Sequence, residues 1–240
     1  MKNRTNTFSS LTPLPTICLS RVPKGNTNSP HLKVAFGQKT FDSEGLEGSR
    51  CFFSRAIHWP GGASGVTIGR GYDMGQRTRL QIERELVHAG LGVGDARYLS
   101  MAAGLRGGSA ERFVRENQRT APILPLLVQK NLFEAITSVE TIADIKRIMT
   151  KPDVVERYGV TEWGALPLPI QELVFDLRYR GDYKPETRVR LQPLIVQSDV
   201  RGLYDLMNDH EYWSEAGVPD ARIKARVALL ESAFAAANAA

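Results

Sequence analysis

The stretch Ser43-Glu44-Gly45, followed by Gly65-Val66-Thr67-Ile68-Gly69-Arg70-Gly71-Tyr72-Asp73-Met74-Gly75, decides the expected fold. An apolar-rich segment precedes Glu44, and the second stretch combines β-branched residues with glycines that are typical of a tight turn. We therefore expect Glu44 at the end of a helix. Thr67 and Asp73 are expected on a strand and turn just downstream.

These residues place two carboxyl groups in different surroundings. Cleavage of a glycosidic bond needs one carboxylic acid that donates a proton to the leaving oxygen and a second carboxylate that stays ionised. Partial burial against apolar residues would favour the protonated form of Glu44. Water and the cation of Arg70 would keep Asp73 charged. The pattern thus favours Glu44 as the acid and Asp73 as the base.

Each of these residues also has a plain structural interpretation. A Glu is usually a solvated surface residue, Thr67 is an ordinary strand residue, and Asp73 beside glycines is typical of a turn. Glu47 is a local competitor of Glu44 because it could share the same helical face. Trp59, which precedes Pro-Gly-Gly, could stack on a sugar ring or cover the edge of the core.

The composition sets limits on the class of protein. The chain has 240 residues, of which 42% are hydrophobic, enough for a sizeable core. Its net charge of +5 favours an acidic polymer as partner, and both bacterial cell wall and nucleic acid fit. No apolar run is long enough to span a bilayer. Cys18 and Cys51 make no disulfide framework, and the four His lack metal-ligand spacing, so we expect no metal and no cofactor.

The chain divides into a tail and one domain. Residues 1–31 are rich in Asn, Thr, Ser and Pro, a composition that disfavours ordered structure, and we expect a flexible N-terminal segment there. Residues 32–240 form the expected domain. The apolar patch 11–19 is broken by Pro13 and Pro15, so we identify no classical secretion signal.

Helical patterns dominate the part after Gly75. Thr78 to Gln81 has the spacing of a capping box, and Gly90 ends the helix that follows. A shorter helix is expected around 191–197, although it contains Pro193, which a helix tolerates only in its first turn. Short β-prone runs lie at 51–53 and 66–68, and further helices are expected at 126–149, 170–178 and 222–237. The expected fold class is α+β, with a small β lobe packed on a mainly helical body.

The motifs around Glu44 and Thr67 resemble those of the phage-type lysozymes, in which a helix ends in Glu-Gly and a strand reads Thr-Ile-Gly-x-Gly. The likeness is closest to the pesticin-like branch, whose catalytic set is a Glu, a Thr on the strand and an Asp six residues later. Glu44, Thr67 and Asp73 fill these places. Ordinary phage lysozymes have their Asp between the Glu and the strand, but residues 48–66 contain no carboxylate. The resemblance covers residues 41–77.

Beyond that region the likeness rests on two weaker similarities to helices of the lysozyme body. One is the segment 174–181, in which Arg180 stands where related sequences often have Asn. The other lies near the C-terminus and comprises Trp213, Arg222, Arg226, Glu231 and Phe234.

The resemblance implies a lysozyme-like fold and a muramidase, which hydrolyses the β-1,4 bond between N-acetylmuramic acid and N-acetylglucosamine in peptidoglycan. Glu44 would protonate the leaving oxygen. Asp73, assisted by Thr67, would direct water from the opposite face and invert the anomer. Such chemistry needs no cofactor or metal. The residues expected to contact substrate are Trp59, Arg70 and Tyr72.

The implied partner is the peptidoglycan glycan strand, not nucleic acid or a membrane interior. Lacking a signal, the chain resembles either an antibacterial effector that a secretion apparatus delivers or a phage endolysin. It would be made in the cytoplasm and act in the periplasm or cell wall of a target bacterium. A delivered hydrolase also implies a cognate immunity protein. The alternatives are a non-catalytic wall-binding module with a lysozyme-like fold, favoured by Arg180, and a nucleic-acid-binding protein, based on charge alone.

Overall fold

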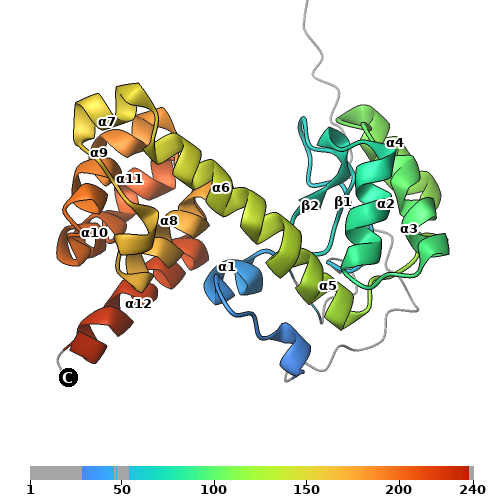
Figure 1. The fold of residues 1–240 in the computed structure, drawn as a ribbon, viewed down its shortest axis with the longest axis horizontal. Coiled ribbons are helices and arrows are strands. Elements are labelled where there is room, and N and C mark those ends of the chain that lie inside the picture. Colours follow the sequence, from blue (N-terminus) through green and yellow to red (C-terminus); the bar gives the residue numbers. More distant parts are fainter. Residues whose placement is uncertain (1–28, 46, 48–53, 238–240) are drawn as a thin grey trace, which may run out of the picture.

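Two groups of helices joined by one long helical stretch make up the computed structural model of the protein (Figure 1). It describes residues 29–45, 47 and 54–237. Strands β1 (Thr67–Ile68) and β2 (Tyr72–Asp73) pair antiparallel and form a small sheet. The protein is therefore mainly helical with a small two-stranded sheet, as the expected α+β class requires.

The small lobe, residues 54–132, packs helices around this hairpin. Ile68 and Tyr72 of the hairpin are fully buried against Ile82 and Leu86 of the first long helix. The elements of the lobe, besides the hairpin, are α2 (Arg79–His88), α3 (Val93–Leu99), α4 (Gly108–Asn117), α5 (Leu126–Leu132) and the 3₁₀ turns η2 (Met74–Gln76) and η3 (Ser100–Ala102).

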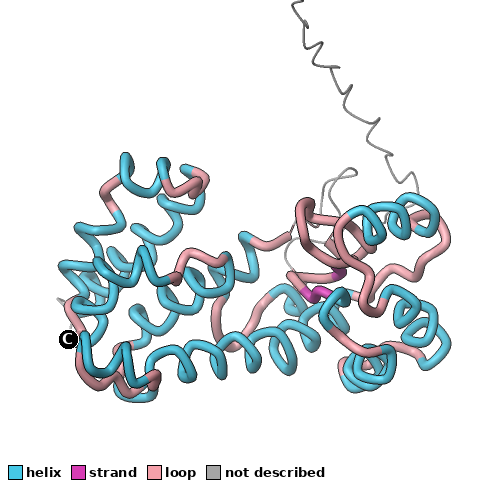
Figure 2. Tube along the Cα trace, turned by 90° about the horizontal axis from the view of Figure 1, so that it is seen from above, coloured by secondary structure: helices cyan, strands magenta, loops and turns pink. Residues whose placement is uncertain are grey.

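A continuous helical stretch leads from the small lobe into the large lobe (Figure 2). It consists of α5, a π-helical turn η4 (Phe133–Thr137) and α6 (Ser138–Met149). The helix predicted over 126–149 is confirmed as this stretch, with the π turn as an interruption that the apolar spacing did not show. Such turns are common at functional sites.

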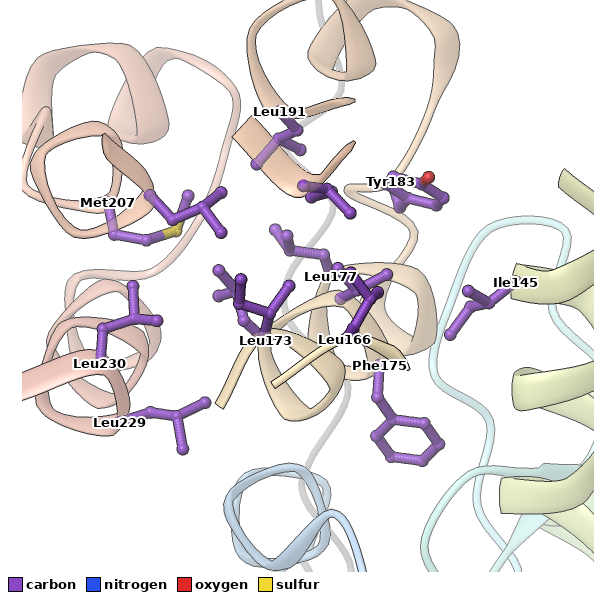
Figure 3. Packing of buried hydrophobic residues seen from close by; sticks show 14 of the residues in the cluster. Ile145, Leu166, Leu173, Phe175, Leu177, Tyr183, Leu191, Met207, Leu229 and Leu230 are labelled. Carbon is purple, nitrogen blue, oxygen red and sulfur yellow. The ribbon is translucent and has the colours of Figure 1, made fainter. Parts of the chain in front are cut away.

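The large lobe, residues 29–43 and 133–237, is built around α8 (Leu168–Arg180). This helix is buried on several sides, as expected of a helix at the centre of a helical body. Figure 3 shows side chains from α6, α9, α10 and α12 around it. The remaining elements are α1 (Gln38–Ser43), α7 (Pro152–Tyr158), α9 (Pro185–Val196), α10 (Val200–Met207), α11 (His210–Glu215), α12 (Asp220–Ala237) and the 3₁₀ turns η1 (Pro30–Leu32) and η5 (Trp163–Ala165).

One polar side chain lies inside this apolar lobe. Asp176 of α8 is buried and accepts a hydrogen bond from Thr40 of α1 at 2.9 Å. Its carboxylate also pairs with Arg222 at 2.6 Å and with Arg226 at 2.7 Å, both on α12. A buried carboxylate is tolerated only when it is paired and hydrogen-bonded. Asp176 therefore joins the first, the central and the last helix of the lobe.

The local predictions of the sequence can now be compared with these elements. The capping box is confirmed, since the Thr78 and Gln81 side chains each bond to the other residue's backbone at the start of α2. The helices expected at 170–178 and 222–237 are confirmed as parts of α8 and α12.

The helix expected around 191–197 is present as the end of α9, but α9 begins at Pro185, so Pro193 lies inside the helix and not in its first turn. Leu191 and Ile195, on either side of the proline, are fully buried in the core. Their packing outweighs the one backbone hydrogen bond that a proline removes. The β-prone run 51–53 and most of the expected tail, residues 1–28, lie outside the described residues.

Within the described residues, no helix has the length and apolar character needed to cross a membrane.

Asp176→Asn should lower the free energy of unfolding at pH 7 by about 3–5 kcal/mol, because it removes the carboxylate that two buried arginines share and leaves them only Glu44 and Asp182 as charged partners. Burial alone would raise the pKa of Asp176, but the charges and hydrogen bonds of Arg226 and Arg222 outweigh it and hold the pKa below its ordinary value. Urea unfolding at a series of pH values measures both effects.

A depressed folded-state pKa stabilises the protein above the unfolded pKa, about 3.9 for Asp, and the stabilisation is lost as the pH falls through the folded value. The difference in free energy of unfolding between wild type and Asp176→Asn should therefore become smaller below about pH 4. Asp205→Asn is the matched control, since Asp205 pairs with Arg201 at the exposed surface and should cost less than about 1 kcal/mol. If the two variants lost the same free energy of unfolding, this role of Asp176 would be contradicted.

Candidate functional site

A cleft of about 450 Å³ opens where the hairpin faces helices α6 and α8. In Figure 1 the hairpin lies on the side of the small lobe that faces the large lobe. The residues that line the cleft are Gly71, Asp73, Gln76 and Arg77 from the small lobe and Thr137, Glu140, Thr141, Asp144, Arg178 and Tyr179 from the large lobe. Asp73 is the predicted site residue that lies in this cleft lining.

Asp73 lies on β2 directly opposite Thr67 of β1. Its carboxylate accepts hydrogen bonds from the backbone N–H of Gly65 at 3.1 Å and of Gly75 at 2.7 Å. Amide donors stabilise the charged form of a carboxylate. The bond from Gly75 caps η2, so the turn role foreseen for Asp73 is present alongside its place in the cleft.

Thr67 is buried, with 4% of its surface exposed. Its hydroxyl donates to the carbonyl oxygen of Gly65 at 3.3 Å. The hairpin register thus brings Thr67 and Asp73 together, as the motif predicts. The described cleft lining includes Asp73 but not Thr67.

Glu44 caps the C-terminal end of α1, where the sequence placed it. Its surroundings differ from the expected apolar ones. The carboxylate pairs with Arg222 of α12 at 2.9 Å, and a quarter of the side chain, 25%, remains exposed. Tyr179, which lines the cleft, is close enough for its hydroxyl to sense the charges of Glu44 and Arg222. Glu44 is therefore held by an ion pair, and it is not among the residues that line the cleft.

Arg70 does not accompany Asp73 as expected. Its side chain is 4% exposed and runs from the tip of the hairpin to α1, where it bonds to main-chain carbonyls and to Glu47. Because the Arg70 guanidinium is buried, it does not fit the expected contact with substrate.

Tyr72 is fully buried as well, and its hydroxyl donates to Glu85 at 2.6 Å. Burial, followed by the hydrogen bond and charge of Glu85, raises the pKa of the Tyr72 hydroxyl well above its ordinary range. Tyr72 thus belongs to the core of the small lobe, and the expected substrate contact does not fit this position.

Glu47, the local competitor of Glu44, is buried in a polar cluster. It accepts hydrogen bonds from Arg55 at 2.9 Å, from Arg70 at 3.0 Å and from Gln129 at 2.6 Å. A carboxylate with this many buried partners has a structural role. Trp59 is half-buried against the small-lobe core, and its indole N–H donates to Ser64, which fits the interpretation as a cover over the core edge.

The sequence analysis missed the charged residues on the α6 side of the cleft. Glu140 pairs with Arg77 of the small lobe through two bonds of 2.5 and 2.7 Å, and Asp144 pairs with Arg178 of α8. Glu140 and Asp144 are four residues apart, which places them on one helical face. That spacing within the predicted helix 126–149 was the available signal.

The described residues contain no group of three or more His, Cys, Asp or Glu that could hold a metal ion. The carboxyl groups of Glu44 and Asp73 are side chains that can donate and accept protons.

Gly65→Ala should destabilise the protein by about 1–3 kcal/mol, because a Cβ there would lie 2.1 Å from Asp73 Oδ1 and 2.4 Å from the Gly75 nitrogen. Urea unfolding checks this value. Gly94→Ala in α3 is the control, since its Cβ meets nothing within 4 Å and should add up to about 1 kcal/mol of stability. A Gly65→Ala protein as stable as wild type would disprove the close packing around Asp73.

Comparison with known proteins places the chain in a family. A search of curated proteins finds no match to the chain. A protein family described as "Domain of unknown function (DUF8812)" matches residues 37–227, which include α1, both strands and the first part of α12. This match covers the hairpin, the cleft and both candidate carboxyl groups. The chain therefore belongs to the DUF8812 family.

Proposed function

We propose that this protein is a muramidase with a lysozyme-like fold that cleaves the β-1,4 bond between N-acetylmuramic acid and N-acetylglucosamine in peptidoglycan. The observation that carries the proposal is the pairing of Thr67 with Asp73 across the hairpin, with Asp73 in the wall of the interlobe cleft. Glu44 ends α1 of the other lobe, and the residue after it, Gly45, is bonded to Arg70 at the tip of the same hairpin. Two carboxyl groups with separate partners are what glycoside hydrolysis uses.

The ion pair of Glu44 is compatible with the role of general acid. Arg222 directs Nε and Nη2 to Asp176, and Nη1 to Oε1 of Glu44. Because Asp176 already offsets much of the positive charge of the Arg222 guanidinium, Glu44 shares this cation with a second carboxylate. A protonated carboxyl accepts with one oxygen and donates with the other. Arg222 would then hold Oε1 and leave the proton on Oε2 for the leaving oxygen.

The partners of Asp73 suit a base that stays ionised. Two backbone amides fix one lone pair on each oxygen, and the remaining lone pairs are available to a water molecule in the cleft. Thr67 donates its hydroxyl proton to Gly65 and is not in the cleft lining, so in this proposal it assists Asp73 through their pairing across the hairpin. In this proposal Asp73 takes the proton of the attacking water.

The net charge of the whole chain fits a cell-wall substrate that bears carboxyl groups. Within the cleft, Arg77 and Arg178 are paired with Glu140 and Asp144. The net charge of +5 favours association with such an anionic polymer. The setting we propose is that of an antibacterial effector or a phage endolysin that acts in the periplasm or cell wall of a target bacterium. For an effector, a cognate immunity protein that fills the cleft is part of the proposal.

A second candidate is a wall-binding module without catalysis. The ion pair of Glu44 and the capping bonds of Asp73 would suffice to hold a fold together. Arg180 also bonds to Asp182 and to the carbonyl of Gly217, away from the cleft lining. The two candidates differ in whether the purified protein releases muropeptides.

Purified wild-type protein should release muropeptides with reducing-end muramic acid from peptidoglycan, identified by mass spectrometry. Glu44→Gln and Asp73→Asn should each lower the rate by about 100-fold or more while remaining folded. Glu186→Gln, an exposed residue in the first turn of α9, is the matched control and should keep the wild-type rate.

The anomeric configuration of the product is a second measurement in the same experiment. Proton NMR at early times should show inversion, as carboxyl groups about 6.5–9.5 Å apart would give. Retention would contradict the assignment of Asp73 as a base for water. Binding to peptidoglycan without any release would favour the wall-binding module, and affinity for nucleic acid that falls steeply with salt would favour a nucleic-acid-binding protein.

A further inference from the structure

Arg70 links the two elements that carry the candidate acid and base. Its backbone forms the tip of the hairpin, between β1 and β2, but its side chain extends to α1. Nη1 donates to the carbonyl oxygens of Phe41 and Gly45, each at 2.7 Å. Phe41 lies in the last turn of α1, and Gly45 follows Glu44 directly. The hairpin that holds Asp73 is thus bonded to the main chain on both sides of Glu44.

The guanidinium of Arg70 is itself held in place by several contacts. Nη2 donates to Glu47 at 3.0 Å, and the guanidinium carbon lies 4.4 Å from the centre of the Phe41 ring. Glu47 is anchored in turn by Arg55 and Gln129 of the small lobe. Because side chains with this many partners have little freedom, the contact between hairpin and α1 is a rigid one.

The backbone of Arg70 makes a third connection. Its carbonyl oxygen accepts a hydrogen bond from the hydroxyl of Tyr179 on α8. The neighbouring Gly71 has a φ of 87°, and a Cβ there would lie 2.6 Å from that hydroxyl. Gly45 is needed for a similar reason, since its Cβ would lie 2.7 Å from Cδ of Arg70. The hairpin, α1 and α8 therefore meet at this one residue.

We propose that Arg70 is a positioning residue that holds the Glu44 end of α1 at a fixed place relative to the hairpin and Asp73. The inference rests on the proposed function, because the position matters to catalysis only if both carboxyl groups act on one substrate. Catalytic groups need placement within about 0.5 Å. A displacement of about 1 Å costs a rate factor on the order of 100. Arg70 acts through Glu44 and makes no contact with substrate.

Three variants separate this role from ordinary stability. Arg70→Met removes the bonds to Phe41 and Gly45, and Arg70→Lys keeps a cation that can bond to one of them. Arg55→Met is the matched control, because Arg55 is also buried and also pairs with Glu47, and it donates to the Leu124 carbonyl in the small lobe. Urea unfolding establishes that each variant is folded under the assay conditions.

For Arg70→Met we expect kcat on peptidoglycan to fall by about 100-fold with KM changed less than about threefold, and the acid limb of the pH–rate profile to shift. Arg70→Lys should recover part of kcat. Arg55→Met should keep kcat within about threefold of wild type, even where it loses as much stability. Equal loss of kcat in Arg70→Met and Arg55→Met would overturn the positioning role while leaving the muramidase intact.

Amide hydrogen exchange tests the position of α1 without using activity. The N–H groups of Phe41 and Glu44 donate to Gly37 and Thr40 within α1, at 2.9 and 3.0 Å. Arg70→Met should speed their exchange by about tenfold or more, and Arg55→Met should not. If the wild type cleaves no peptidoglycan but this difference appears, the muramidase is wrong and the link through Arg70 stands. Unchanged exchange in Arg70→Met would overturn the link itself.

Discussion

The buried carboxylate of Asp176 is the constraint on which the arrangement of the large lobe depends. It receives hydrogen bonds from Thr40 of α1 and from Arg222 and Arg226 of α12. Since α1 and α12 lie at opposite ends of the described chain, a single side chain of α8 closes the lobe. The same interaction orients Arg222, whose remaining nitrogen reaches Glu44. The position of the candidate acid is thus a consequence of how the lobe is closed.

A second buried carboxylate, Glu47, joins separate segments of the chain at the small lobe, as Asp176 does in the large lobe. Through Arg70 it reaches the main chain at the end of α1, and through Gln129 it reaches α5. The short helix α1 is therefore anchored at Thr40 by one network and at its C-terminal end by the other. Side chains that several buried hydrogen bonds hold have little freedom to move. Glu44 lies between two such networks, although α1 itself has six residues.

The sequence predicts local features well and long-range partners poorly. The capping box at Thr78, the glycine-rich hairpin and the end of α1 at Glu44 follow from neighbouring residues, and all three are present. The pairing of Glu44 with Arg222 spans 178 positions, and no local pattern indicates which of the 31 Lys and Arg residues meets a given carboxylate. The apolar surroundings expected for Glu44 were wrong for that reason.

The networks around Asp176 and Glu47 also help to decide whether the site has a catalytic role or only stabilises the fold. Replacing a buried ion pair by well-packed apolar residues is often neutral or stabilising, so such networks are weak devices for stability alone. Here both of them converge on the six residues of α1 and end at the neighbours or the carboxyl of Glu44. A wall-binding module needs a folded surface, which an apolar core would supply. Groups fixed on both sides of one carboxyl are what a reaction with a defined proton path requires.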